Sequence, residues 1–184
     1  MKSFRHLDES ECIARAQHGD ALAFSELVSR HQDRIYRFLA RLTRSPDDAL
    51  DLTQETFLSA YQALGRWRPQ ARFSTWLFQI ARNLAFDQLR RTRRVEFVAL
   101  QEEQESAIQD TAPTPDAALQ TTQRLRALEQ ALARLPAEHR EILLLREIED
   151  LAYDDIAEVL GISLGTVKSR LARARAGLLE RMPH

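Results

Sequence analysis

The carboxyl-terminal part of the chain combines positive charge with small side chains in a spacing that suits nucleic-acid binding. On a helical wheel of residues 164–178, one face carries Val167, Leu171, Ala174 and Leu178. The opposite face carries Gly165, Thr166, Ser169, Ala172, Arg173 and Ala176, with Lys168, Arg175 and Arg170 at its edges. Small residues let a helix enter the major groove of DNA, and flanking cations can contact phosphates on both sides. This face is therefore a candidate DNA-reading surface.

The residues before this helix predict a helix-turn-helix. Ile156, Ala157 and Leu160 form an apolar line at helical spacing. Gly161 suits the left-handed turn that follows, and Ser163 can cap the second helix. An ordinary surface hairpin of two helices would share this pattern, although its exposed face would normally carry more acidic residues.

A second basic region covers residues 63–94, which hold eight arginines and one aspartate. Within a helix predicted from about Ser74 to Arg94, one line of side chains comprises Trp76, Asn83, Asp87, Arg90 and Arg94. Aromatic and amide groups can bind unpaired bases while arginines follow the phosphates. The preceding loop, with Arg66, Arg68, Gln70, Arg72 and Phe73, could form a pocket for a base turned out of the duplex. The alternative is that Trp76 is a core aromatic residue and the arginines are a solvated helix end.

The segment 45–61 is acidic, with four carboxylates and no lysine or arginine. Ser45 and Pro46 predict the start of a helix over 46–64. Its predicted buried residues are Ala49, Leu50, Thr53, Phe57, Ala60, Tyr61 and Leu64. Its solvent face carries Asp48, Asp51, Glu55 and Gln62, with Leu58 among them and Leu52 at the border. Apolar anchors among charges are typical of protein-docking surfaces, although a solvated helix with one exposed leucine is the alternative.

The whole chain of 184 residues is predicted to be all-α, because it has only 5 glycines and 6 prolines and several helical periodicities. Further helices are expected from Asp20 to Leu42, over 117–134 and from Pro136 onward. Residues 95–100 are the one alternating run, which is weak evidence for a strand. Residues 101–116 are acidic and lack periodicity, which predicts a flexible linker.

Several classes of protein are disfavoured by composition. The amino terminus has no apolar segment typical of a signal peptide, and the longest aliphatic run is far shorter than a membrane span. Cys12 is the only cysteine, and the five histidines lack metal-ligand spacing. We therefore expect a cytoplasmic protein with no metal and no cofactor.

Three segments in series resemble a known family. They are DALDLTQETFLSAY (48–61), FSTWLFQIARNLAFDQLRR (73–91) and LPAEHREILLLREIEDLAYDDIAEVLGISLGTVKSRLARAR (135–175). In this order they resemble bacterial RNA polymerase sigma factors of the sigma-70 superfamily, extracytoplasmic-function (ECF, group IV) type. The resemblance implies two small helical domains, sigma region 2 at 1–94 and sigma region 4 at 117–184, joined by a flexible acidic linker at 95–116.

The resemblance also implies roles for three sets of residues. Docking on polymerase would involve Asp48, Asp51, Leu52, Gln54, Glu55, Leu58 and Gln62. Recognition of the melted −10 element would involve Arg68, Gln70, Arg72, Phe73, Trp76, Asn83, Asp87, Arg90 and Arg94. Recognition of the −35 duplex would involve Thr166, Lys168, Ser169, Arg170, Ala172, Arg173 and Arg175. Ala172 is smaller than the side chain that family members often carry there.

The implied partners are RNA polymerase core (the β′ clamp helices and the β flap), promoter DNA and an anti-sigma factor, usually membrane-anchored. No small-molecule substrate and no catalytic activity are implied. Two other functions stay open on the residues alone. A dimeric repressor would explain the helix-turn-helix but leaves residues 73–94 without a role. An enzyme acting on nucleic acid would need a carboxylate pair, a phosphate-binding glycine loop, a nucleophile elbow or metal spacing, none of which the sequence carries.

Overall fold

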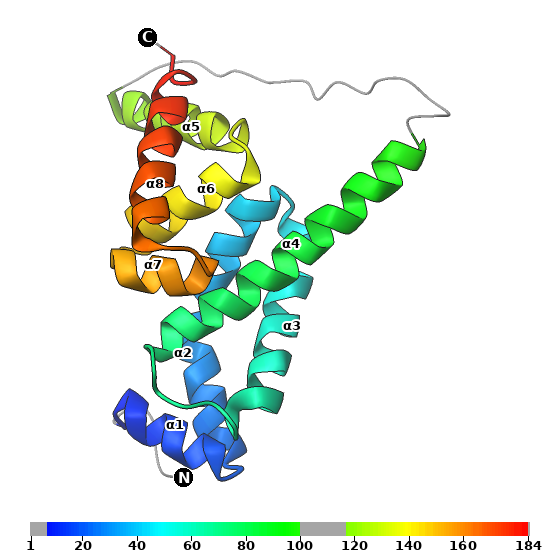
Figure 1. Ribbon diagram of the computed structural model, residues 1–184, viewed down its shortest axis with the longest axis vertical. Coiled ribbons are helices and arrows are strands. Elements are labelled where there is room, and N and C mark those ends of the chain that lie inside the picture. Colours follow the sequence, from blue (N-terminus) through cyan, green and yellow to red (C-terminus); the bar gives the residue numbers. More distant parts are fainter. Residues whose placement is uncertain (1–6, 100–116, 184) are drawn as a thin grey trace.

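The computed structural model describes residues 7–99 and 117–183, and these are helical in both parts of the chain (Figure 1). The amino-terminal helices are α1 (Glu9–Gln17), α2 (Ala21–Thr43), α3 (Pro46–Leu64) and α4 (Phe73–Ala99). The carboxyl-terminal elements are α5 (Ala117–Ala133), α6 (Ala137–Leu143), the π-helical turn η2 (Leu144–Ile148), α7 (Tyr153–Leu160) and α8 (Leu164–Leu179). The predicted all-α fold with two helical domains is confirmed.

Side-chain caps determine where α2 and α3 begin, at the residues that the sequence predicts. Asp20 accepts hydrogen bonds from the backbone N–H groups of Leu22 and Ala23, at 3.0 and 3.1 Å. The Ser45 hydroxyl accepts a hydrogen bond from the N–H of Asp48 at 3.2 Å. These bonds satisfy donors that a helix start leaves without an intrahelical partner, so both helices begin at a defined position.

The buried side of α3 differs from the prediction at four positions, which are Leu50, Leu52, Thr56 and Tyr61. Leu50 and Tyr61, expected in the core, are 54% and 46% exposed, whereas Leu52, expected at the border of the solvent face, is only 5% exposed. Thr53 and Thr56 are buried, and their hydroxyls donate to backbone carbonyls one turn earlier at 2.6 and 2.7 Å. Because these bonds offset the cost of burying a hydroxyl, threonines occupy core positions that apolarity alone would assign to other residues.

Helix α4 extends further than predicted. It begins at Phe73 and continues to Ala99, so residues 95–99 are helical and the weak strand prediction there is wrong. This also moves the first residues of the predicted linker into a helix, and residues 100–116 lie outside the described part of the chain. None of the helices described is long and apolar enough to cross a membrane.

The carboxyl-terminal part contains the predicted helix-turn-helix. Helix α7 ends at Gly161, whose φ of 64° lies in the left-handed region. The Ser163 hydroxyl accepts a hydrogen bond from the N–H of Thr166 at 3.2 Å and caps α8. Ile156 of α7 and Val167 of α8 are fully buried, so both helices pack onto the core through the faces that the sequence predicts.

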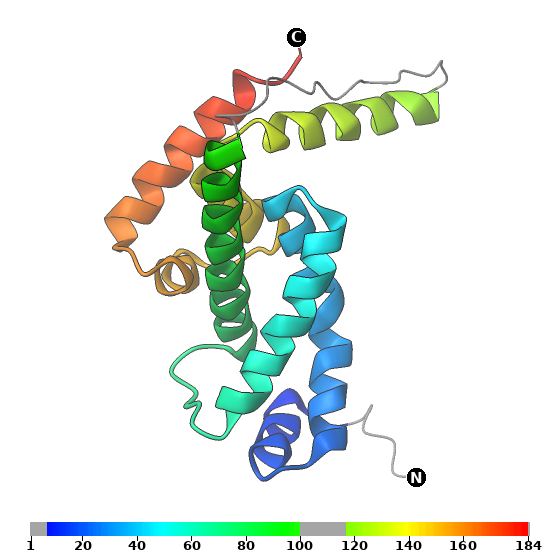
Figure 2. The same cartoon turned by 90° about the vertical axis from the view of Figure 1, so that its right-hand side faces the viewer.

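The two parts of the chain pack against each other, with α4 on α7 and α2 on α6 and η2 (Figures 1 and 2). Ion pairs join them: Arg34 pairs with Glu149 at 2.9 Å and Arg82 pairs with Glu141 at 2.8 Å. The hydroxyl of Thr75 on α4 also donates to Asp155 on α7 at 3.1 Å. The contact surface between the two domains is therefore rich in charged groups.

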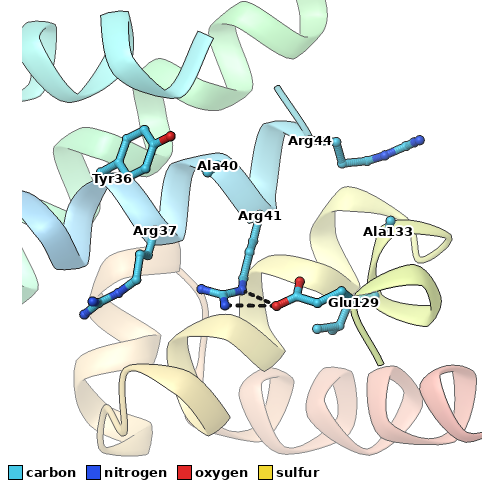
Figure 3. A pocket seen from close by; sticks show the side chains of 8 residues that line it. Tyr36, Arg37, Ala40, Arg41, Arg44, Glu129 and Ala133 are labelled. Carbon is cyan, nitrogen blue, oxygen red and sulfur yellow. Dashed lines mark hydrogen bonds and ion pairs between the residues drawn. The ribbon is translucent and has the colours of Figure 1, made fainter. Parts of the chain in front are cut away.

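A groove of about 360 Å³ lies between α2 and α5. Figure 3 shows Arg41 pairing across it with Glu129, at 2.9 Å, while Arg37 and Arg44 point away from this pair. At the end of α2, the carbonyl of Leu42 accepts a hydrogen bond from the buried guanidinium of Arg140 at 2.7 Å. Burial, assisted by the charge of Arg44, lowers the pKa of Arg140 to about 10. Sequence reasoning gave Arg140 no role, although it connects α6 to the end of α2.

Candidate nucleic-acid interface

The loop of residues 65–72, between α3 and α4, packs on a cluster of aromatic side chains. The ring of Trp67 lies 5.8 Å from that of Phe73 and 5.6 Å from that of Trp76, and Phe73 lies 5.5 Å from His31. Phe73 is only 2% exposed, so the expectation that it lines an open base pocket is wrong. Trp76 is partly buried in the same cluster, as its interpretation as a core residue requires. These rings support the loop from below.

Beyond Trp67 the loop exposes the polar residues that were predicted. Arg68, Gln70 and Arg72 are all exposed. The backbone N–H of Gln70 donates to the carbonyl of Arg68 at 2.8 Å, which makes a tight turn at the tip. Two cations and one amide therefore surround this tip, and such groups can bind a phosphate and the edge of a base.

The predicted line on α4 continues from the loop along the helix surface. Asn83, Asp87, Arg90 and Arg94 are exposed, whereas Trp76 at its start is not fully so. Arg90 forms an ion pair with Asp87, which partly offsets its charge. The line is therefore accessible to a partner along most of its length.

The predicted DNA-reading face of α8 is smaller than the sequence suggested. Arg170, expected at the edge of this face, is 20% exposed and lies 3.8 Å from the buried Glu141, so its side chain is directed toward the protein. Arg175 is exposed but pairs with Glu147 at 2.7 Å, and this hydrogen bond raises the pKa of Arg175. Thr166 is half-buried, with its hydroxyl 2.8 Å from that of Ser163. Four of the residues predicted to read the −35 element are exposed here, namely Lys168, Ser169, Ala172 and Arg173, and we call them the α8 face; Gly165 and Ala176 of the predicted face are exposed as well.

Glu141 explains the position of Arg170. Its side chain is completely buried and lies between Arg82 of α4 and Arg170 of α8. Burial raises the pKa of Glu141, while the two arginines oppose that shift. Since a buried carboxylate needs charged partners, Arg170 turns toward the protein rather than toward solvent.

Helix α3 presents an acidic face that also carries exposed apolar side chains. Of the predicted docking residues, Asp51, Gln54, Glu55, Leu58 and Gln62 are exposed, Asp48 is partly exposed and Leu52 belongs to the core. The exposed Leu50 and Tyr61 lie beside Gln54 on the helical wheel, and sequence reasoning had placed both in the core. We call this surface the α3 face, and it comprises Leu50, Asp51, Gln54, Glu55, Leu58, Tyr61 and Gln62.

Comparison with known proteins connects these three surfaces. The sigma-70 region 2 model matches residues 27–95, and the sigma-70 region 4 model matches residues 125–178. The ECF RNA polymerase sigma factor SigM of Mycobacterium tuberculosis is 37% identical over 171 residues, which cover 92% of this chain and 82% of SigM. The chain belongs to the ECF group of sigma-70 factors. It is thus a transcription initiation factor of RNA polymerase.

Other relatives agree with this membership. The ECF sigma factor SigE of Mycolicibacterium smegmatis is 38% identical over 156 residues, and the match spans 60% of that longer protein. The structure of the sigma factor RpoE from Bartonella quintana, solved in complex with the anti-sigma factor NepR, superposes with a TM-score of 0.68 at 28% identity. That match covers 86% of this chain and 95% of RpoE. In the present chain, the region 2 match contains the α3 face and the 65–72 loop, and the region 4 match contains the α8 face.

Proposed function

We propose that this sigma factor directs RNA polymerase core to promoters by reading duplex DNA at −35 and unpaired bases at −10. The observation that supports this is that one chain exposes three faces of two chemical kinds. The α8 face and the loop with α4 are basic, whereas the α3 face is acidic with apolar anchors. A factor that joins DNA to a protein machine needs surfaces of both kinds.

The −35 element is assigned to the α8 face. Ala172 and Ser169 are small enough for the helix to lie deep in the major groove, and Lys168 and Arg173 lie beside them. Arg173 is the residue that can make a bidentate contact with guanine, because Arg170 and Arg175 are engaged by carboxylates. Specificity at −35 should therefore depend mainly on Arg173.

The −10 element is assigned to the loop tip and the line on α4. Opening the duplex costs ~1.4 kcal/mol per stacked step, and each base held by a protein contact returns ~1–3 kcal/mol. Arg68, Gln70 and Arg72 would hold a captured base, and Asn83 and Arg90 would follow the strand. A small basic surface cannot supply the melting energy alone, so attachment to polymerase must make these contacts intramolecular.

Core binding is assigned to the α3 face. Leu50, Leu58 and Tyr61 would insert as apolar anchors, while Asp51 and Glu55 would guide the encounter with basic residues. By its family membership, the partner is the clamp-helix region of the β′ subunit, with the β flap contacting the region 4 domain. We also propose that the chain itself catalyses no reaction and requires no cofactor.

An anti-sigma factor is the proposed regulator, as in the RpoE complex with NepR. Such a partner would keep the sigma factor from polymerase and, if membrane-anchored, would hold it at the inner membrane; the released factor would act in the cytoplasm. The corresponding measurement is competition in a native gel, in which the anti-sigma factor and core polymerase should exclude each other.

The decisive experiment is run-off transcription with purified core polymerase on genomic fragments. We expect defined transcripts that neither core polymerase nor the sigma factor makes alone. A matched variant, Asp51→Lys with Leu58→Ala, should lose core binding and all transcripts while retaining its helical circular dichroism. Absence of any sigma-dependent transcript at modest ionic strength, or normal core binding by the variant, would overturn the assignment.

A further inference from the structure

The side chain of Gln17 connects helix α1 to the start of the 65–72 loop. The amide nitrogen of Gln17 donates to the carbonyl of Leu64 at 3.1 Å and to that of Trp67 at 2.9 Å. Both acceptors are carbonyl oxygens, so the amide must present its NH₂ group to them. Gln17 is the last residue of α1, and α1 lies beside the loop in both views (Figures 1 and 2). The loop therefore leaves α3 along a path that α1 fixes.

The far end of the loop is connected to α1 by a second route. Glu9, in the first turn of α1, accepts a hydrogen bond from the ring nitrogen Nε2 of His31 at 2.7 Å. The His31 ring in turn packs edge-on against Phe73, the residue at which the loop ends and α4 begins. His31 and Phe73 are both buried, so these two rings have little freedom to move, whereas the Glu9 side chain is 42% exposed.

Trp67 joins the two routes within the loop. Its carbonyl accepts from Gln17 and, at 3.1 Å, from the guanidinium of Arg68, while its ring packs on Phe73 and Trp76. The exposed tip from Arg68 to Arg72 is therefore anchored at Trp67 on one side and at Phe73 on the other. A loop held in its binding shape loses less conformational entropy when a ligand binds.

We propose that α1 is a brace that positions the 65–72 loop for capture of an unpaired base, and that Gln17 is its positioning residue. The inference depends on the proposed −10 function of the loop. It goes beyond that function because α1 lies before residue 27, where the match to sigma-70 region 2 begins. It also assigns a role to a residue that would touch no DNA.

The test uses holoenzyme made from core polymerase and the full-length chain. The probe is a fluorescent single strand carrying the −10 sequence of a promoter found by run-off transcription. Companion strands each replace one base by an abasic site, which identifies the captured base as the position where wild-type affinity falls most. The readout is the ratio of the two dissociation constants, abasic over intact. A purely structural defect would weaken both strands equally and leave this ratio unchanged.

We expect Gln17→Ala and the isosteric Gln17→Glu to weaken binding of the intact strand about five- to tenfold, as loss of two partly buried hydrogen bonds implies. Binding of the abasic strand should stay the same, so the ratio should fall toward one. Gln32→Ala, a change of the same type at an exposed position of α2, should keep the wild-type ratio. Trypsin should also cleave after Arg66 and Arg72 faster in both Gln17 variants than in the wild type.

Two failures can be distinguished by including the triple variant Arg68→Ala, Gln70→Ala, Arg72→Ala. If this variant lowers the ratio and both Gln17 variants keep it, the brace is wrong and the −10 assignment stands. If the triple variant also keeps the ratio, the loop does not capture a base and the proposed function itself fails at this site.

Discussion

The 65–72 loop and helix α8 are both basic surfaces assigned to DNA, but they are built in different ways. The shape of α8 is set by residues within a short stretch, from the turn at Gly161 and the cap at Ser163 to the buried Leu171. The loop is held by residues far away in sequence, since Gln17 lies 47 and 50 positions from the carbonyls it binds. Although Glu141 and Glu147 pair with two arginines of α8, its backbone is set locally, so distant mutations should disturb α8 less than they disturb the loop.

The largest expected effect comes from removing the aromatic support of the loop. Phe73→Ala deletes a ring that is 2% exposed, and truncation of a buried phenylalanine typically lowers the free energy of unfolding by about 3–5 kcal/mol. Urea unfolding measures this loss. Arg72→Ala, next to it but exposed, should change the free energy by less than about 0.5 kcal/mol. Equal effects of the two substitutions would mean that Phe73 does not support the loop.

A second prediction separates two arginines on consecutive turns of α8. Arg173→Ala should weaken promoter binding by the holoenzyme about tenfold and relax base preference at −35, because a bidentate base contact is worth ~1–3 kcal/mol. Arg170→Ala should have the smaller effect on DNA, since that side chain faces Glu141. Electrophoretic mobility shifts on promoters with altered −35 sequences provide the measurement. The reverse order would move the DNA face toward Arg170.

The third prediction tests how locally the helix-turn-helix is encoded. Gly161→Ala places a Cβ at a φ of +64° and should lower the free energy of unfolding by about 1 kcal/mol. Gly165→Ala, inside α8 with no tight contact for a new Cβ, should raise it by up to about 1 kcal/mol. Thermal denaturation of both variants checks the sign. Destabilisation by Gly165→Ala would show that packing around the start of α8 is tighter than described.

The smallest expected effect concerns the pH dependence of the support under the loop. Burial lowers the pKa of His31, although the hydrogen bond to Glu9 opposes the shift. Because the unfolded chain then binds the proton more readily, this contribution to stability is complete above the ordinary histidine pKa of about 6.5 and is lost as the pH falls below it. Urea unfolding between pH 7.5 and 5.5 should show a steeper decline for the wild type than for His31→Gln. If the free energy of unfolding fell equally with pH in the wild type and in His31→Gln, the lowered pKa of His31 would not contribute to stability.

Sequence reasoning succeeded where neighbours along the chain decide the structure. The starts of α2, α3 and α8 follow from Asp20, Ser45 and Ser163, because a cap bonds to an N–H within three residues. The domain limits at 94 and 117 remain predictions, and the experiments above test the −10, −35 and polymerase-binding roles.

Sequence reasoning failed where packing against another element determines which side chains are buried. Leu52 and Leu50 are two residues apart, and only the packing of α3 on its neighbours selects the first for the core. Arg170 and Arg173 look alike in sequence, but only Arg170 forms an ion pair with the buried Glu141, which lies 29 positions before it. Phe73 looked like a ligand contact because its partners, Trp67 and His31, come from other parts of the chain. The positions of such partners could not be derived from periodicity.

The shared carboxylate of Glu141 limits how far apart the two halves of the chain can lie in this conformation. Arg82 of α4 and Arg170 of α8 both lie within 4 Å of it, at 2.8 and 3.8 Å. The −10 and −35 elements are about 25 base pairs apart, which corresponds to roughly 85 Å of duplex at 3.4 Å per pair. A carboxylate that binds both arginines cannot hold the two halves of the chain that far apart. Under the proposed −10 and −35 assignments, the halves of the chain would separate before both ends of a promoter are engaged, and Glu141 would exchange its arginine on α4 for water.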